Sequence, residues 1–162
     1  MAGYTKGFPL DFNQAYTKAA DFCAFQERCL SEVKLKLISW NIDRSFIAKI
    51  LQQLQQEGFI NEKRYAVNYA GGKFRMKGWG KIKIAASLRS RSVSSVFISE
   101  ALQSIDPDLY LQTLETLIAK KLQQLGNDSI ENKQKAALFA ASRGFEPSLI
   151  FSLLKDITLS DL

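Results

Sequence analysis

The sequence predicts an all-α protein built from three tandem three-helix repeats that form an elongated curved array. Three observations support this fold. Apolar residues recur every three or four positions from Asp11 onward, with no lasting strand-like alternation. Short polar or glycine-bearing junctions interrupt the pattern eight times, which leaves nine helices. The junctions also recur at a nearly constant interval, as they do in stacked repeats.

The N-terminal residues 1–15 are expected to be loosely ordered, because Gly3, Gly7 and Pro9 disfavour a helix.

The junctions that follow lie near residues 29–31, 40–43, 58–61, 78–80, 91–94, 106–107, 126–128 and 144–147. Most carry residues typical of helix ends: the caps Ser31, Asp43, Asn61, Ser94 and Asp106, the first-turn prolines Pro107 and Pro147, and the glycines Gly58, Gly126 and Gly144.

The repeat is seen by aligning the turns at Ile42, Val93 and Phe145, which are 51 and 52 residues apart. The apolar positions after each turn then agree: Ile47, Ile98 and Ile150; Ile50, Ala101 and Leu153; Leu51, Leu102 and Leu154; Leu54, Ile105 and Ile157. The same apolar helix face therefore recurs three times along the sequence. The predicted repeats are residues 16–58, 61–105 and 107–157.

Positive charge is concentrated in one segment, residues 63–99, which contains no Asp or Glu and is called here the acid-free segment. It holds nine of the 22 basic residues, Lys63, Arg64, Lys73, Arg75, Lys77, Lys81, Lys83, Arg89 and Arg91. The rest of the chain has 13 basic and 16 acidic residues, a net charge of −3. A local field of one sign attracts polyanions, so nucleic acid, or protein assembled on it, is the first partner to consider. The alternative is that these cations lie on a solvent-exposed helix face and keep the protein soluble without binding a partner.

Aromatic residues lie within the acid-free segment and are candidates for stacking on bases. The spacing of Tyr65 and Tyr69 is more typical of core positions, whereas Trp79, between Gly78 and Gly80, is expected to be exposed. The two glycines lack the spacing of a nucleotide-hydrolysing loop. They are expected to end one helix and begin the next, leaving free amides that suit a backbone phosphate.

Catalysis is not expected. The chain has no histidine to serve as a base, its serines lack a nucleophile motif, and its carboxylates form no obvious pair.

Cys23 and Cys29, six residues apart in a segment that reads as helical, are expected to be buried apolar residues rather than a disulfide. No metal or other cofactor is expected. Without a secretory signal or a membrane-spanning run, the protein is expected to be soluble, cytoplasmic and monomeric.

A helix-turn-helix that reads DNA sequence is a competing interpretation, since residues 82–90 and 94–104 have the right lengths. The second of these helices carries no Arg, Lys or Asn and only one Gln, so it has few groups to contact base edges. Sequence-specific DNA reading is therefore disfavoured.

The run from Asn61 to Ala66, followed by Phe74 to Ile82 and by Leu88, resembles the central signature of the RecX family. The signature is an acidic turn, an Arg-aromatic-Ala motif, a basic helix end, a glycine-bearing turn and a basic helix. Leu54 to Ile60 and Lys133 to Phe145 also resemble boundaries of that family's repeats. The resemblance covers roughly residues 20–157, and it implies three tandem three-helix repeats.

The resemblance implies a regulator without catalytic activity that binds the RecA filament on single-stranded DNA. Such proteins modulate, mostly negatively, the recombinase and coprotease activities of RecA, and so regulate DNA repair and the SOS response. The implied contacts to RecA or to DNA phosphates are Arg64, Lys73, Arg75, Lys77, Trp79, Lys81, Lys83, Arg89 and Arg91. Arg64 has an alternative role, pairing with Glu62 or with a neighbouring helix. A sequence-independent nucleic-acid-binding module acting on naked DNA is the alternative function.

Two features depart from the family pattern. The pair Gly71 and Gly72 falls inside a predicted helix, where each glycine costs about 1 kcal/mol relative to alanine, so a kink or fraying is expected there. Ser92 stands where the family has a turn glycine. Neither departure removes the basic residues.

Overall fold

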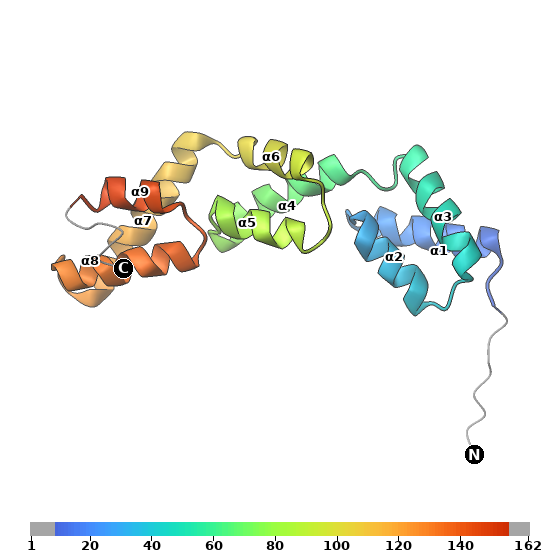
Figure 1. The fold of residues 1–162 in the computed structure, drawn as a ribbon, viewed down its shortest axis with the longest axis horizontal. Helices are drawn as coiled ribbons and strands as arrows, with labels where there is room; N and C mark the ends of the chain where they lie inside the picture. The colour runs from blue at the N-terminus through green and yellow to red at the C-terminus, as the bar shows by residue number, and fades with distance from the viewer. Residues whose placement is uncertain (1–8, 156–162) are drawn as a thin grey trace, which may run out of the picture. The chain divides into compact units, whose positions relative to one another are not determined.

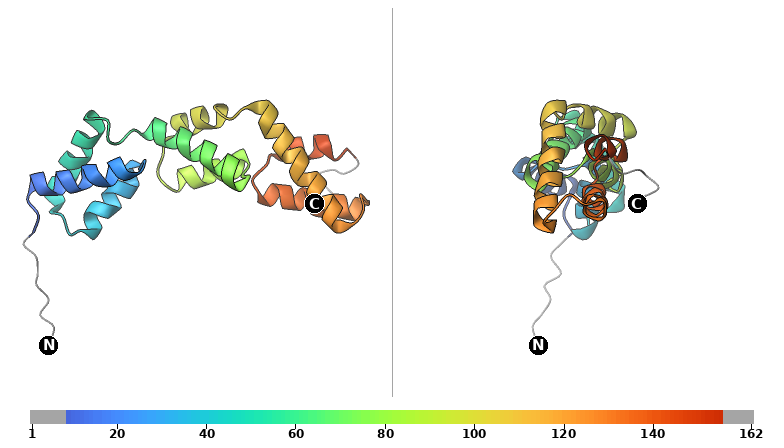
Figure 2. Two further views of the ribbon diagram at one scale, coloured as in Figure 1. Left: turned by 180° about the vertical axis from the view of Figure 1, so that it is seen from behind. Right: turned by 90° about the vertical axis from the view of Figure 1, so that its left-hand side faces the viewer.

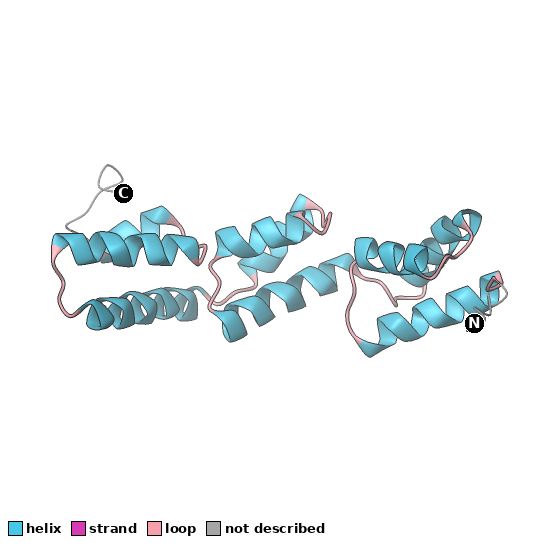
Figure 3. Cartoon of the chain, turned by 90° about the horizontal axis from the view of Figure 1, so that it is seen from below, coloured by secondary structure: helices cyan, strands magenta, loops and turns pink. Residues whose placement is uncertain are grey.

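The structure is a computed structural model that describes residues 9–155. Within these residues the chain forms nine helices and no strand (Figures 1 and 3). The helices are α1 (Phe12–Phe25), α2 (Leu30–Ser39), α3 (Arg44–Gln56), α4 (Glu62–Lys77), α5 (Lys81–Arg89), α6 (Ser95–Gln103), α7 (Pro107–Leu125), α8 (Ile130–Ser142) and α9 (Pro147–Leu153). The predicted all-α class is confirmed.

The chain divides into two compact units, residues 1–65 and 66–162. In the first unit α1, α2 and α3 pack against one another. In the second unit α5 packs against α6, and α7 against α8 and α9, as Figure 2 shows. The repeat boundaries 16–58, 61–105 and 107–157 remain a proposal.

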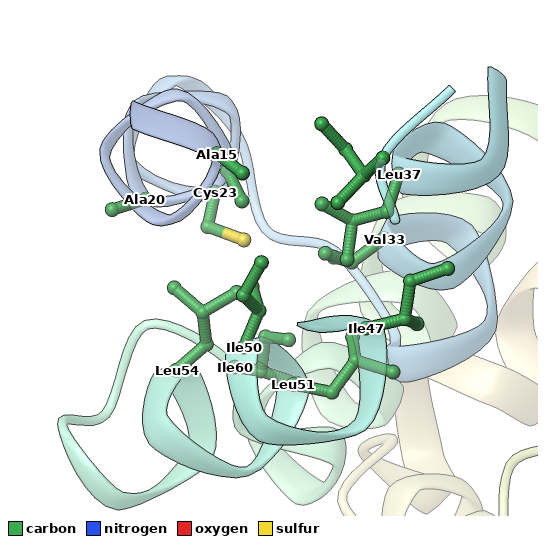
Figure 4. Close-up of a cluster of buried hydrophobic side chains, with 12 residues drawn as sticks. Ala15, Ala20, Cys23, Val33, Leu37, Ile47, Ile50, Leu51, Leu54 and Ile60 are labelled. Atoms are coloured by element: carbon green, nitrogen blue, oxygen red, sulfur yellow. The ribbon is translucent and has the colours of Figure 1, made fainter. Parts of the chain in front are cut away.

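The core of the first unit is formed by apolar side chains from all three of its helices (Figure 4). Cys23 of α1, Val33 and Leu37 of α2, and Ile50 and Leu54 of α3 point into one space and are almost completely buried. Each large aliphatic side chain buried in this way contributes about 1.5–3 kcal/mol to folding. The amphipathic pattern in the sequence therefore leads directly to this core.

Both cysteines are free and buried, as expected. Burial raises the pKa of the Cys23 thiol to about 11, so this thiol stays protonated at neutral pH and is a poor nucleophile. Cys29 does not lie inside a helix, contrary to the helical interpretation of its segment. It occupies the position that precedes α2.

The N-terminal boundary differs from the prediction. α1 begins at Phe12, inside the stretch 1–15 that was expected to be loosely ordered. The reason is a capping box that the sequence interpretation overlooked: Asp11 Oδ1 accepts from the Gln14 amide at 2.8 Å, and Gln14 Oε1 accepts from the Asp11 amide at 3.1 Å. Residues 1–8 of that stretch lie outside the described residues.

Most predicted caps act as caps. Asp43, Asn61 and Asp106 accept hydrogen bonds from the amides of Ser45, Arg64 and Leu109, at 2.8, 2.9 and 2.8 Å. Pro107 and Pro147 begin their helices, and Gly58, Gly126 and Gly144 have positive φ angles. Ser31 is not a cap, because α2 already begins at Leu30. Ser94 holds a cap position without a side-chain hydrogen bond.

The three aligned turns share one backbone geometry. Asn41, Ser92 and Gly144 have positive φ angles of 55°, 60° and 92°. The next residue, Ile42, Val93 or Phe145, is buried in every case. Its amide donates to the carbonyl five residues earlier, at 3.2, 3.2 and 3.3 Å. The period read from the sequence thus corresponds to a recurring helix-ending turn.

Ser92 is the least suited of the three residues to its conformation. Glycine adopts positive φ freely and asparagine tolerates it, whereas a left-handed conformation costs other residues about 1–2 kcal/mol. We expect Ser92→Gly to raise the free energy of unfolding by about 0.5–1 kcal/mol, after the greater chain entropy of unfolded glycine is subtracted. Urea denaturation followed by circular dichroism measures this change.

Ser94→Gly is the matched control. Ser94 has an ordinary φ of −63° and makes no capping bond, so the substitution relieves no strain and should be neutral or slightly destabilising. Equal effects of the two substitutions would show that the backbone at Ser92 carries no strain.

The fraying expected as one outcome at Gly71 and Gly72 is absent from the described structure. α4 runs unbroken from Glu62 to Lys77 through both residues. The Arg75 guanidinium lies against Gly71, where an added Cβ would be 2.8 Å from its Nη1 atom, whereas nothing lies within 4 Å of the Cβ position at Gly72. The helical hydrogen bonds on either side are sufficient to carry the chain through two weak helix formers.

Candidate interaction surface

The acid-free segment forms α4 after its first residue, α5 and the first part of α6, and its cations differ in exposure. Lys63 and Arg64 belong to the first unit and the other seven to the second. Arg75, Lys77 and Arg89 are exposed, as are Lys63 and Arg64. The half-buried cations are Lys73, Lys81, Lys83 and Arg91. The predicted contact residues are therefore not equally available to a partner.

Arg64 is held inside the first unit by two contacts. Its Nε atom forms an ion pair with the carboxylate of Glu27, and its Nη2 atom donates to the carbonyl of Gly58 at 3.0 Å. Glu62, which the sequence offered as a partner, instead accepts from the Leu30 amide at 3.0 Å. The geometry therefore favours the alternative, orienting role of Arg64 over partner contact.

A cluster of cations and aromatic rings covers α4 and α5. Lys73 Nζ lies 5.2 Å from the centroid of the Tyr69 ring and 5.1 Å from that of Trp79. Lys83 Nζ lies 4.9 Å from the Trp79 centroid, and Arg91 Cζ lies 4.8 Å from the Tyr69 centroid. The expectation that Trp79 is exposed is not met, because this residue is half-buried and both lysines lie near its ring.

Cation–π contacts of this kind orient side chains but do not by themselves identify a binding site. The first unit has a similar contact, with Lys18 Nζ 4.3 Å from the centroid of the Trp40 ring. Within the acid-free segment, Tyr65 and Phe74 are buried, and the Tyr69 hydroxyl lies 2.6 Å from Ser87 Oγ. Within the acid-free segment, Arg75, Lys77 and Arg89 thus remain as the exposed cations that belong to the second unit.

The start of α5 is not a free phosphate site, contrary to the expectation from the sequence. The Gly80 amide donates to the Arg143 carbonyl at 2.8 Å, and the Ile82 amide donates to the Gly144 carbonyl at 2.9 Å. The Lys81 amide donates to the Tyr110 hydroxyl at 2.9 Å. These amides bond the start of α5 to the turn between α8 and α9 and to Tyr110 of α7, so they are not available to an anion.

Tyr110 lies at the centre of this joint. Its ring packs between Phe74 and Phe145, with centroids 5.6 and 5.1 Å away. Its hydroxyl accepts from the Lys81 amide and donates to Glu146 Oε2 at 2.5 Å. Burial, followed by the bond to Glu146, raises the pKa of this phenol well above its ordinary value, so Tyr110 remains a hydrogen-bond donor.

We expect Tyr110→Phe to lower the free energy of unfolding by about 1–3 kcal/mol. The substitution keeps the ring but leaves the Lys81 amide and the Glu146 carboxylate without their buried partner. Thermal and urea denaturation measure the loss. Tyr69→Phe removes a hydroxyl at a half-buried site, where water can replace it. This substitution should therefore lower the free energy of unfolding by less than Tyr110→Phe does. A larger effect at Tyr69 would contradict the role given to Tyr110.

A groove in the second unit was missed by the sequence interpretation. Its volume is about 470 Å³, and it lies between the end of α4, one face of α7 and the end of α8. Its cations are Lys77, Lys120, Lys121 and Arg143. Only Lys77 belongs to the acid-free segment. The other three are scattered along the sequence, so no local run of charge could reveal them.

Two further properties bear on function. Among the described residues, no three His, Cys, Asp or Glu side chains come together as ligands for a metal ion. No helix within residues 9–155 is both long enough and apolar enough to span a membrane.

The chain matches two family descriptions. That of "RecX, second three-helix domain" matches residues 61–102, and that of "RecX, third three-helix domain" matches residues 108–154. Together the two matches cover more than half of the chain. They include α4, α5, α8 and α9 completely, and all but one residue each of α6 and α7.

Curated proteins named "Regulatory protein RecX" are similar along most of the chain. The relative from Chlorobium phaeobacteroides is 28% identical over 147 residues, covering 91% of this chain and 95% of the relative. The relative from Bacillus cytotoxicus is 25% identical over 148 residues, and the match covers 91% of this chain but only 55% of that protein. The chain therefore spans nearly all of the first relative and about half of the second.

Solved structures agree in fold. The crystal structure of RecX from Lactobacillus salivarius superposes with a TM-score of 0.81 at 23% identity, covering 90% of this chain and 95% of that one. A second crystal structure of a regulatory protein RecX gives a TM-score of 0.77 at 22% identity. Because the family matches, the curated relatives and the fold agree, the chain belongs to the RecX family.

Proposed function

We propose that this chain regulates the RecA recombinase by binding the RecA filament on single-stranded DNA. The observation that carries the proposal is the set of exposed cations Arg75, Lys77 and Arg89 in a segment without acidic residues. A filament of protein on DNA presents negative charge along its length, which such a surface attracts. The regulatory name of the relatives supports this assignment.

Exposed apolar side chains favour a protein-containing target over naked DNA. In the acid-free segment, Met76 is 82% exposed, Val96 62% and Ile82 50%. Single exposed apolar residues are common on protein surfaces, but methionine beside cations is typical of protein interfaces. Binding to the phosphates of naked DNA would make no use of these exposed apolar side chains. The alternative, a module that binds naked strands without sequence preference, relies only on the cations.

Met76→Gln distinguishes these two functions. We expect it to weaken binding to RecA–DNA filaments several-fold and to leave binding to the same strand without RecA unchanged, since the substitution alters apolar contact but not charge. Fluorescence anisotropy with a labelled strand measures both affinities. Leu35→Gln in the first unit, where Leu35 is 66% exposed, is the matched control. Equal filament affinity of parent and Met76→Gln would favour the naked-strand function.

The proposed regulation is inhibitory, non-catalytic and carried out by a monomer in the cytoplasm. Added to RecA that is hydrolysing ATP on single-stranded DNA, the chain should slow hydrolysis as filament is lost or blocked. An unchanged rate at saturating concentration would contradict inhibition. Size-exclusion chromatography with light scattering tests the monomer.

A further inference from the structure

We infer that the groove between α7, α8 and the end of α4 binds the phosphate groups of a nucleotide, with its sugar or base against the apolar floor. This site shares Lys77 with the exposed cations named above but does not include Arg75 or Arg89, and the inference does not rest on the proposed function. Its volume of about 470 Å³ is within the usual range for small-ligand sites.

Four cations converge on the groove from three places in the chain. Lys77 ends α4, Lys120 and Lys121 lie on α7, and Arg143 follows α8. Lys121 Nζ and Arg143 Cζ lie 4.8 and 5.4 Å from the centroid of the Phe139 ring, so this ring holds both cations at the groove. None of the described residues lining it is acidic.

Glu115, one of the two acidic residues of α7, lies away from the groove. Thr113 and Leu117 both line it, and Glu115 is two residues from each of them. At about 100° per residue, Glu115 is therefore turned about 200° around the helix from the groove face. Glu115 is therefore on a different face of α7 from Lys120 and Lys121, which line the groove.

The joint at Tyr110 positions the two ends that complete the groove. The Gly80 amide binds the carbonyl of Arg143 itself, so the backbone that carries the Arg143 side chain is fixed against the residues that follow α4. Lys77 and Gly78 immediately precede that contact and line the groove. A long-range contact between distant parts of the chain therefore assembles this cation cluster.

A phosphate ligand suits the groove better than an acidic peptide. Linked phosphates carry several charges close together, whereas an extended peptide carries at most one charge per residue, about 3.3–3.6 Å apart. Three of the four cations are lysines, which act as point charges toward phosphate oxygens. The side chains of Gln112 and Thr116 add hydrogen-bonding groups, and Leu117 supplies an apolar surface for a sugar or base.

The test is a titration of the full chain with four ligands: ATP, inorganic tripolyphosphate, a 20-nucleotide oligothymidylate, and a polyglutamate of matched charge. The groove variant is Lys120→Gln with Lys121→Gln. The control is Lys34→Gln with Lys49→Gln, two exposed lysines of the first unit. Circular dichroism checks folding, and Lys120→Gln alone, at an exposed position, replaces the double variant if its fold changes.

The inference predicts that the groove variant binds ATP or the oligonucleotide about tenfold more weakly than the parent, and that the control does not. Weakened ATP and tripolyphosphate binding identifies a free nucleotide as the ligand. If the oligonucleotide alone is affected, the ligand is a strand, and the slope of log K against log salt should fall by about 1.4 for two lost contacts. Unchanged binding of every phosphate ligand, or tighter binding of polyglutamate that the groove variant loses, would overturn the inference.

Discussion

Gly80→Ala is expected to lower the free energy of unfolding of the second unit by about 3 kcal/mol or more. A Cβ at Gly80 would lie 2.3 Å from the backbone C and O atoms of Gly144 and from the Phe145 amide nitrogen. Backbone atoms cannot turn aside as a side chain can, so the start of α5 must move away. The move also breaks the bonds from the Gly80 and Ile82 amides, which adds about 0.5–1.5 kcal/mol each to the cost of overpacking.

The measurement uses the two tryptophans, of which Trp40 lies in the first unit and Trp79 in the second. In a Trp40→Phe background, Trp79 fluorescence during urea denaturation reports on the second unit alone. Gly72→Ala is the matched control, since nothing lies within 4 Å of its Cβ position and alanine favours the helix by about 0.5–1 kcal/mol. The same substitution should therefore have opposite signs at the two sites. An undiminished stability of Gly80→Ala would contradict the close approach.

Replacing Arg75, Lys77 and Arg89 with Glu is expected to weaken filament binding by about tenfold or more, with helix content unchanged. All three side chains are exposed, so reversal of their charge should not disturb the core. Reversed charges at an interface replace attraction with repulsion and slow association. Lys81 and Lys83 are poorer choices, because both are half-buried and lie over the rings of Tyr110 and Trp79.

The control for net charge is Lys34, Arg44 and Lys49 replaced with Glu. These exposed cations lie in the first unit, outside the acid-free segment, and the control changes the net charge by the same amount. If both triple variants lose binding equally, the attraction depends on total charge, and no particular surface is identified.

Local features of the fold were predictable from the sequence. The helix-ending turns at Ile42, Val93 and Phe145 appeared as a period in the sequence, because a buried apolar residue and a recurring face of Ile and Leu must accompany each turn. Most caps were predictable because a cap bonds to an amide only two or three residues away. Asp11 was overlooked although its capping box is visible as Asp11 and Gln14.

Features that depend on distant residues were not predictable. The glycines at 78 and 80 suggested free amides for a phosphate, but Gly80 is there because the Gly144 backbone packs directly against it. The half-buried ring of Trp79 has Lys73 and Lys83 from two different helices near it. Lys120 and Arg143 line the same groove only because α7 and α8 pack together. Sequence spacing describes one helix at a time and cannot report such contacts.

The most direct test of the central claim is binding of the chain, over a salt series, to RecA filaments on single-stranded DNA and to the same strand without RecA. The proposed regulation predicts tighter binding to the filament, and a preference that persists as salt weakens the phosphate contacts. Equal binding to filament and naked strand, falling together with salt, would contradict it and leave a nucleic-acid-binding module.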